Sequence, residues 1–275
     1  MLIHPMKSLP CLVLHCAGVS DTGRVRNNNE DAMAWHAGTG LAVLADGMGG
    51  YNAGEVAAAL AVDGIGSDML RWLRQHPGSS AEQVQQALAA AVRAANQAIV
   101  RHAGSDAQCA GMGTTLVAAV FGAGTLVLCH VGDSRCYRLR AGSLQQLTRD
   151  HSWLQEQIDA GWLSAEEAQY YGPRNLVTRA LGVQDNAQEE CQNLPVQAGD
   201  LYLLCSDGLH DLIGDALLQA ALARSQTLED KAQSLVDLAN AHGGNDNISV
   251  LLVQVGAAGD CADNGLLQAP LQRLP

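Results

Sequence analysis

The sequence predicts an α+β fold, in which strands and helices occupy separate layers. The first observation is that strand-like apolar runs and amphipathic helical patterns each come in groups and do not alternate strictly along the chain. The second is that 48% of the 275 residues are hydrophobic and 16% are charged. A chain of this length and composition buries a core that needs no disulfide or metal for stability. The formal net charge of −12 predicts repulsion from nucleic acid and from anionic membranes.

The first half of the chain is predicted to form two strands followed by two helices. Residues 12–20 and 32–45 are apolar runs with strand character, and the second ends in LAVLAD. Residues 55–73 are Ala-rich with apolar side chains at helical spacing, which predicts a long helix. A second helix is expected over 80–102, because Ser80 and the Gln three residues later form a capping box.

The second half returns to strands before the last helices. Residues 114–131 carry no charged residue and approach membrane-spanning length, but Gly122 and Gly124 favour two buried strands joined by a tight turn. Short apolar runs predict three more strands, at 135–139, 201–206 and 248–255. Helical periodicity predicts helices at 152–160, 164–170, 212–223 and 228–241.

One domain is expected over residues 1–255, because no internal repeat or linker interrupts it. Residues 256–275 lack periodicity and are expected to form a flexible tail. The eight cysteines show no metal-ligand spacing and are expected to be mainly buried free thiols. The patch LPCLVLHC ends in Cys16 like a lipoprotein signal, but His15 stands where a small residue belongs. These observations favour a cytoplasmic protein.

Four aspartates lie at the ends of predicted strands. In an antiparallel sheet the C-terminal ends of some strands adjoin the N-terminal ends of their neighbours, so these carboxylates can meet at one rim. Carboxylates at close quarters repel one another unless a cation lies between them, and oxygen ligands suit Mg²⁺ or Mn²⁺. For each aspartate alone, ordinary turn chemistry is the alternative. Asp46 ends LAVLAD, Asp133 ends LVLCHVGD, Asp207 ends LYLLCSD and Asp246 precedes ISVLLVQV.

The Gly-rich turn ADGMGG admits close backbone approach, so a carbonyl could join a coordination sphere. A nucleotide-binding loop is the alternative, but Asn52 stands where GxGxxG requires its third Gly, and the chain has no GK[ST]. The turn therefore favours the metal-site hypothesis.

Eight ordered motifs resemble those of the metal-dependent protein serine/threonine phosphatases, the protein phosphatase 2C or PPM family. The resemblance extends from about residue 17 to residue 254 and implies a bacterial, free-standing member with a single phosphatase catalytic domain over 1–255. It implies a four-layer α-β-β-α sandwich, in which two antiparallel sheets are flanked by antiparallel helices. The motifs are SDTGRVRNNNED, ADGMGG, GMGTT, VGDSRCYRLR, LTRDHS, RNLVTRALG, CSDGLHD and GGNDNISV.

The resemblance also implies a site for two Mn²⁺ or Mg²⁺ ions. Asp46 would bridge the two ions, with the Gly47 carbonyl on one and with Asp207 and Asp246 on the other. Asp133, together with Asp207, would hold a weaker third ion. Two such ions can share a water, lower its pKa and orient it for in-line attack on phosphorus. The chain lacks the GxSxG elbow and the Cys–Arg loop of covalent hydrolases, which agrees with attack by water.

Three further residues match family positions around the metals. Arg26 corresponds to the phosphate-binding arginine, whose planar guanidinium can bind two phosphate oxygens. Its alternative is a solvated turn arginine. Glu30 and Asp31 resemble the acids that hold metal-bound waters. For Asp133 the alternative is a structural cap.

Residues 148–181 resemble the flap beside the catalytic cleft, where substrates are selected. Many relatives carry His-Pro shortly before the Arg-Asn pair, whereas this chain has Tyr171 followed by Gly. Substrate contacts are expected around Tyr171 and Arg174. The aromatic side chains of the segment, Trp153, Trp162, Tyr170 and Tyr171, are expected mainly to pack, with contact to a substrate peptide as the alternative.

The usual proton donor of animal relatives is replaced. They carry His directly after the Asp-Gly pair, where this chain has Met48, which cannot donate a proton. His210 follows SDGL, but a lone His at a helix start is more simply a cap or surface residue. The source of the leaving-group proton is therefore left open.

The function expected is hydrolysis of phosphoserine and phosphothreonine in proteins. One alternative is a catalytically weak pseudophosphatase that acts as a regulatory binding module, but such modules usually lose ligands, and Arg26, Asp46, Asp207 and Asp246 are all present. A second is a phosphatase of small phosphorylated metabolites. The expected partners are phosphorylated proteins and a cognate Ser/Thr kinase, and we expect a monomer that binds neither nucleic acid nor membrane.

Overall fold

The computed structural model describes residues 13–49, 53–122, 124–168, 176–256 and 269–275. Its strands are β1 (Leu14–Asp21), β2 (Asp31–His36), β3 (Leu41–Met48), β4 (Gly113–Thr114), β5 (Leu116–Gly122), β6 (Thr125–Val131), β7 (Arg135–Arg140), β8 (Ser143–Gln146), β9 (Glu190–Pro195), β10 (Leu201–Cys205), β11 (Ile248–Val255) and β12 (Gln272–Leu274). Its α-helices are α1 (Ala53–Gln75), α2 (Ala81–Ser105), α3 (Trp153–Asp159), α4 (Ala165–Ala168), α5 (Asp207–His210), α6 (Asp215–Leu222) and α7 (Leu228–Ala241).

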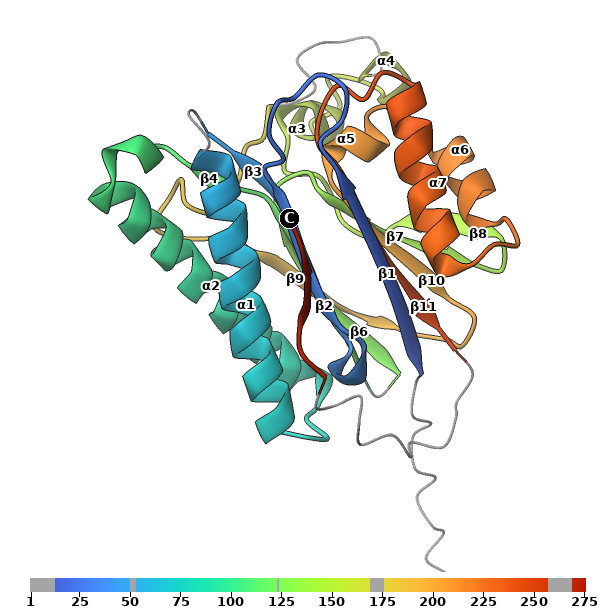
Figure 1. Ribbon diagram of the computed structural model, residues 1–275, viewed down its shortest axis with the longest axis horizontal. Coiled ribbons are helices and arrows are strands. Elements are labelled where there is room, and N and C mark those ends of the chain that lie inside the picture. The colour runs from blue at the N-terminus through green and yellow to red at the C-terminus, as the bar shows by residue number, and fades with distance from the viewer. Residues whose placement is uncertain (1–12, 50–52, 123, 169–175, 257–268) are drawn as a thin grey trace, which may run out of the picture.

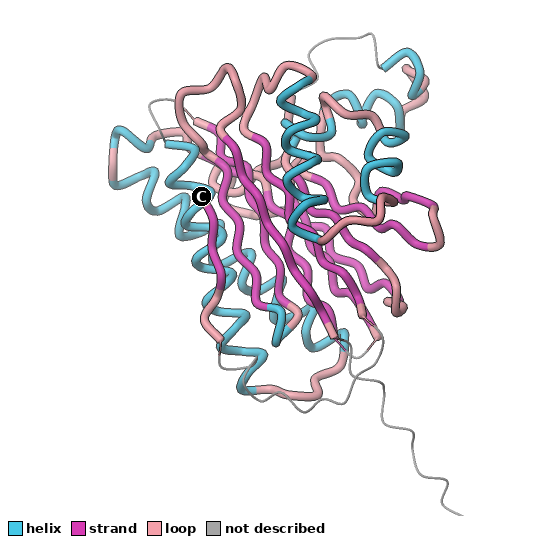
Figure 2. The backbone as a smooth tube through the Cα atoms, turned by 45° about the vertical axis from the view of Figure 1, so that its right-hand side comes forward, coloured by secondary structure: helices cyan, strands magenta, loops and turns pink. Residues whose placement is uncertain are grey.

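The strands form two antiparallel sheets with helices on both outer sides (Figures 1 and 2). The first sheet has the order β1-β11-β10-β7-β8, and the second has the order β12-β2-β3-β5-β6-β9, with β4 paired to β3. Helices α1 and α2 cover the second sheet, and α6 and α7 lie on the side of the first sheet. The α+β class and the four-layer sandwich are confirmed.

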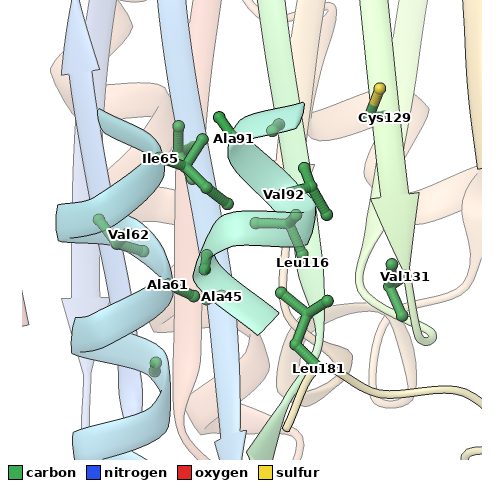
Figure 3. Packing of buried hydrophobic residues seen from close by; sticks show 14 of the residues in the cluster. Ala45, Ala61, Val62, Ile65, Ala91, Val92, Leu116, Cys129, Val131 and Leu181 are labelled. Carbon is green, nitrogen blue, oxygen red and sulfur yellow. The ribbon is translucent and has the colours of Figure 1, made fainter. Parts of the chain in front are cut away.

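Three apolar clusters hold the four layers together. Met33 and Trp35 of β2 pack between the two sheets, against side chains such as Leu251 of β11. Their neighbours Ala32 and Ala34 point the other way, toward α1 and α2 (Figure 3 shows part of this cluster). A third cluster joins the outer face of the first sheet to α5, α6 and α7. Because both faces of β2 are covered, every residue of that strand is buried, and the residues between Asp31 and His36 are all apolar.

Several elements agree with the sequence, and one predicted strand is divided. The capping box at Ser80 is present, with Ser80 Oγ accepting from Gln83 N–H and Gln83 Oε1 accepting from Ser80 N–H. The single strand expected over 32–45 is instead β2 and β3, separated by a 3₁₀ turn that ends at Gly40. Gly40 has φ +71°, and a Cβ there would lie 2.0 Å from the Phe121 carbonyl oxygen, so only glycine makes this turn.

The C-terminal segment is partly ordered against the second sheet. Gln272, Arg273 and Leu274 form β12, which pairs antiparallel with β2. Arg273 Nη1 lies 2.8 Å from Asp63 Oδ1 of α1. The expectation of a flexible tail is therefore wrong for these residues, because pairing with an open sheet edge needs little sequence periodicity.

The cysteines also depart from expectation at one pair. Cys129 of β6 and Cys191 of β9 lie directly opposite each other in the sheet and form a disulfide. The expectation of free thiols is wrong for this pair, since the sequence places its members 62 residues apart. Among the other described cysteines, Cys16, Cys109, Cys136 and Cys205 are free. No helix among the described residues is long and apolar enough to cross a membrane.

Candidate active site

The aspartates singled out in the sequence meet at one end of the sandwich. Asp46 near the end of β3 lies opposite Asp31 at the start of β2. Asp207 begins α5 directly after β10, and Asp246 precedes β11, the strand that pairs with β10. Asp133 occupies the turn between β6 and β7. We call these five carboxylates the acidic rim.

Burial and the charges of neighbouring acids raise the pKa values of Asp46, Asp133 and Asp207 in the acidic rim. Burial, followed by the charges of Asp31, Asp207, Asp133 and Asp246, raises the pKa of Asp46 well above its usual value. Burial and the nearby Asp246 charge raise the pKa of Asp207 to about 7. Burial and the Asp207 charge raise the pKa of Asp133 to about 7 as well. Carboxyl groups so close together either hold protons or share cations, so the rim has the donor chemistry of a divalent metal site.

Asp31 has one oxygen in a hydrogen bond and one without a partner. Ser206 Oγ donates to Asp31 Oδ2 at 2.8 Å, whereas buried Asp31 Oδ1 has no hydrogen-bond partner among the described residues. Burial raises the pKa of Asp31 to about 6, although hydrogen bonds from Ser249 and Ser206 oppose the rise. A buried carboxylate oxygen without a protein partner can accept a hydrogen bond from a water at the centre of the rim.

The glycines that follow Asp46 and Asp207 are required by close backbone approach. A Cβ on Gly47 would lie 2.1 Å from the Gly54 carbonyl oxygen, and one on Gly208 would lie 2.1 Å from the Asn247 carbonyl oxygen. Any larger residue would push the adjacent aspartate out of the rim. The two Asp-Gly pairs therefore share one packing reason, which the sequence shows only as a repeated dipeptide.

Arg26 lies at the edge of the rim and reaches solvent. Its Nη2 lies 2.6 Å from Asp246 Oδ2, and 52% of its side chain is exposed. Arg26, Asp207 and Asp246 line a cavity of about 320 Å³, which we call the phosphate cavity. Burial is the largest cause that raises the pKa of nearby Glu30, so this acid sits partly desolvated beside the same centre.

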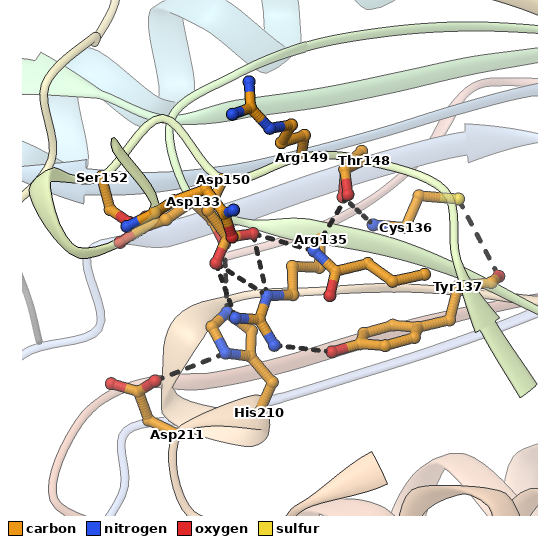
Figure 4. A network of polar contacts seen from close by, with 12 residues as sticks. Asp133, Arg135, Cys136, Tyr137, Thr148, Arg149, Asp150, Ser152, His210 and Asp211 are labelled. Carbon is orange, nitrogen blue, oxygen red and sulfur yellow. Dashed lines mark hydrogen bonds and ion pairs between the residues drawn. The ribbon is translucent and has the colours of Figure 1, made fainter. Parts of the chain in front are cut away.

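A polar network adjoins Asp133 and was not singled out from the sequence (Figure 4). Arg135 binds Asp150 through two donors, with Nε 2.9 Å from Oδ1 and Nη2 2.6 Å from Oδ2. Its Nη1 donates to the Tyr137 hydroxyl at 2.8 Å. His210 Nε2 lies 3.1 Å from the Asp133 carbonyl oxygen. The only sequence signal for this network is that Arg135 and Asp150 belong to two of the matched motifs.

Part of the predicted flap lies within the described residues. Tyr171 and Arg174 lie outside them, so their expected substrate contacts stay predictions. Helices α3 and α4 are present, and the side chain of Trp162 between them is 76% exposed. The expectation that the aromatic side chains pack is therefore wrong for Trp162. Met48 ends β3 beside the rim, paired with Gly113.

A second group of possible ligand side chains adjoins the turn that carries Asp133. The ligand atoms of His130, His151 and Glu190 lie within 4.8 Å of one another. Gly132 N–H donates to His151 Nδ1 at 3.2 Å, which places the proton of a neutral ring on Nε2, toward Glu190. Burial, then His130 and Arg179, lowers the pKa of His151 to about 4, so the ring is neutral at physiological pH. His151 therefore acts here as a hydrogen-bonding residue.

Comparisons with known proteins agree with this geometry. The family model described as protein phosphatase 2C matches residues 23–252. The serine/threonine phosphatase Stp of Listeria innocua is 38% identical over 244 residues, which cover 88% of this chain and 96% of the relative. A structure of the catalytic domain of the serine/threonine phosphatase PstP with two manganese ions has a TM-score of 0.79 at 40% identity, covering 89% of this chain and 99% of that one.

PppA, described as a key regulatory component of the T6SS in Pseudomonas aeruginosa, is also similar in structure. Its TM-score is 0.76 at 35% identity, with 88% of this chain and 97% of that chain covered. The match of the family model spans most of the chain, and the Asp-Gly turns, the acidic rim and Arg26 all lie inside it. The chain belongs to the protein phosphatase 2C family.

Proposed function

We propose that the acidic rim is the catalytic centre of a protein serine/threonine phosphatase that requires two Mn²⁺ or Mg²⁺ ions. Asp46, the Gly47 carbonyl, Asp207 and Asp246 would hold the two ions. The observation that carries this assignment is the position of Asp46 among other carboxylates, two of which, Asp207 and Asp246, line a cavity together with Arg26. PstP, whose catalytic domain binds two manganese ions, is similar over almost the whole domain.

The donor set fits hard divalent cations. Every side-chain donor at the rim is a carboxylate oxygen, which is the ligand type that Mg²⁺ and Mn²⁺ prefer. The pKa values of Asp207 and Asp133 are raised, so the charged form of each carboxylate is unfavourable here unless a proton or a metal ion neutralises it. When bound, two divalent cations would lower the pKa of a shared water and neutralise charge on the phosphate. Asp133 is proposed as a ligand of a weaker third ion.

The chain's own residues position the substrate around this centre. Arg26 reaches solvent from the wall of the phosphate cavity, and its guanidinium can bind two oxygens of a phosphate monoester. Glu30 and Asp31 would orient water at the rim through hydrogen bonds. His210 points its Nε2–H at the Asp133 carbonyl oxygen and does not line the phosphate cavity. With Met48 at the family's histidine position, solvent water would protonate the leaving group.

The finer biological assignment extends the proposal. We propose a monomeric, cytoplasmic enzyme that removes the phosphate groups added by a cognate Ser/Thr kinase, so that phosphorylation of their shared substrates is reversible. The similarity to PppA supports a regulatory role for this chain, because PppA is described as a key regulatory component of the T6SS. Affinity capture with Asp46→Asn, which should retain phosphoprotein substrates, is expected to recover a kinase or its substrates. Recovery of neither would contradict the pairing.

Phosphate release from a phosphothreonine peptide tests the central proposal. With Mn²⁺ or Mg²⁺ the wild-type protein should release phosphate, and a chelator should stop the reaction. Asp46→Asn should reduce kcat by more than about 10²-fold, because one shared ligand is weakened. Asp237→Asn, the same change at an exposed position of α7, is the matched control and should keep its rate.

Two outcomes would replace the proposal. A folded wild-type protein that releases no phosphate with either metal would favour the pseudophosphatase alternative. Faster turnover of small phosphorylated metabolites than of phosphopeptides, compared side by side, would favour the metabolite phosphatase. Wild-type turnover by Asp46→Asn would contradict the assignment of the metal ligands.

A further inference from the structure

A second cavity, of about 220 Å³, lies beside the phosphate cavity. It is bounded by α3 of the flap, by the turn at Asp133 and by the end of α5. Asp211, the residue after α5, lines both cavities, so a peptide with its phosphate in one can place a neighbouring side chain in the other. We call this second space the flap cavity.

The two walls of the flap cavity differ in chemistry. Leu154 and Ile158, four residues apart on α3, form an apolar wall together with Ala168 of α4. The opposite wall carries Asp133, Asp211 and His210. An apolar wall facing hydrogen-bond acceptors matches a ligand with a hydrocarbon stem and a donor at its end.

His210 is a buried residue of the polar wall. The imidazole is 8% exposed, and its Nε2 must donate to the Asp133 carbonyl oxygen, because a carbonyl can only accept. The other ring nitrogen, Nδ1, is buried and lies 3.4 Å from Asp211 Oδ1 (Figure 4). The ring therefore lies between the Asp133 carbonyl oxygen and the Asp211 carboxylate, and the Asp211 carboxylate is the acceptor that this part of the wall offers to a ligand.

The arginine in the flap cavity is already engaged. Arg135 directs Nε and Nη2 to Asp150 and Nη1 to the Tyr137 hydroxyl (Figure 4). Burial alone would lower its pKa, but the Asp150 and Tyr137 contacts raise it, so the guanidinium stays charged within this network. The charge of Arg135 is therefore matched by Asp150, and the carboxylate of Asp211 lines the cavity beside this ion pair.

We propose that the flap cavity binds the side chain of an arginine or lysine that lies a few residues from the phosphorylated residue of a protein substrate. This inference rests on the proposed function and names a class of substrate for it. The aliphatic stem would lie along Leu154 and Ile158, and the charged head would donate to the carboxylate of Asp211. The formal net charge of −12 would assist the approach of such basic segments.

The test uses phosphothreonine peptides that differ at one position at a time. Arginine, lysine, citrulline or alanine is placed at each of the positions within about four residues of the phosphothreonine, and kcat/KM is measured with Mn²⁺. Citrulline has the shape of arginine without its charge. At one position at least, kcat/KM for the arginine peptide should exceed that for the alanine peptide by about tenfold, mainly through a lower KM. The kcat/KM for the citrulline peptide should be close to that for the alanine peptide.

Variants of Asp211 test whether this residue causes the preference for an arginine peptide. The arginine-to-alanine ratio should fall toward one in Asp211→Asn, stay partly in Asp211→Glu, and invert in favour of a glutamate peptide in Asp211→Arg. Asp215→Asn, an exposed acid four residues further on, is the matched control and should keep the wild-type ratio. Because each variant is compared with itself on two peptides, a general loss of activity does not affect the result.

The outcomes separate this inference from the proposed function. Metal-dependent release from every peptide with equal kcat/KM would overturn the flap-cavity assignment and leave the phosphatase function intact. A preference for arginine that Asp211→Asn does not change would also overturn the assignment. This result is expected if a metal ion bound to Asp133 occupies the flap cavity. Release from no peptide would overturn both.

Discussion

Burial raises the pKa values of Asp31, Asp133 and Asp207, three carboxylates of the acidic rim. The pKa of Asp31 is raised to about 6, and those of Asp133 and Asp207 are raised to about 7. In each case burial is the largest cause and neighbouring acids add to it. Without cations these groups bind protons more tightly in the folded chain than in the unfolded chain.

The metal-free protein should therefore be more stable in mild acid than above neutral pH. A carboxyl with a raised pKa contributes stability that is fully present below the unfolded value near 4 and is lost as pH rises through 6 to 7. Thermal unfolding in chelator should give a higher Tm at pH 5 than at pH 8. Mn²⁺ should raise Tm more at pH 8 than at pH 5, because deprotonated carboxylates bind the ion.

Asp207→Asn provides the control for this pH dependence. It removes one titrating group from the rim, so the decline of Tm between pH 5 and pH 8 in chelator should become shallower. An equal decline in Asp207→Asn and in the wild type would mean that other groups, or the net charge of the whole chain, control the pH dependence.

Among the elements, β12 shows how a short segment can complete a sheet. Its three residues pair with β2, and Leu271 just before it packs against the α1 side of the second sheet. A Cβ on Gly66 of α1 would lie 2.8 Å from Leu271 Cδ2, so the helix has a glycine where the segment crosses it. The contact surface is small and lies away from Arg26 and the phosphate cavity.

Removal of residues 271–275 should destabilise the protein without affecting its chemistry. The loss of Leu271 burial and of the β12 pairing should lower the free energy of unfolding by about 1–3 kcal/mol, by the usual value for one buried Leu. Denaturant unfolding measures this change, and kcat on a phosphopeptide should stay within about twofold. The single variant Arg273→Ala is a milder control, because its ion pair with Asp63 is half exposed. A large fall in kcat would show instead that β12 supports the rim through β2.

At the scale of the whole molecule, the Cys129–Cys191 disulfide closes a loop of the chain that includes the described part of the flap. The bond joins β6 to β9, the last strand in the order of the second sheet. Between the two cysteines lie β7, β8, α3 and α4, and thus the apolar wall of the flap cavity, whereas His210 and Asp211 lie outside this loop. The disulfide therefore restrains a segment that the sheets hold at its two ends.

Reduction of this disulfide should lower the free energy of unfolding by about 2–4 kcal/mol, chiefly because the unfolded chain regains loop entropy. Denaturant unfolding with and without a dithiol measures the change, and mass spectrometry of a digest should recover the linked Cys129 and Cys191 peptides. Cys129→Ser/Cys191→Ser should be insensitive to the dithiol. If the wild type is equally insensitive, the two thiols are not bonded in solution.

Much of the fold could be predicted because local rules and long-range packing agree for most elements. Apolar runs located β5, β6, β10 and β11, and the capping box located the start of α2. The strands β8 and β9 were not predicted, because they are short and partly exposed, and their polar residues carry no strand signal. Their conformation depends on the neighbouring strands β7 and β6.

The sequence by itself determined the order of the motifs, the family resemblance and the identity of the rim carboxylates, since each depends on residue types at short spacing. Tertiary structure decided which groups meet. The partner of Cys129, the engagement of Arg135 by Asp150 and the shared position of Asp211 between two cavities all depend on segments distant in the chain. The physical reason is that desolvation, repulsion between carboxylates and strand register arise only when the sheets are packed, and a linear pattern carries none of these distances.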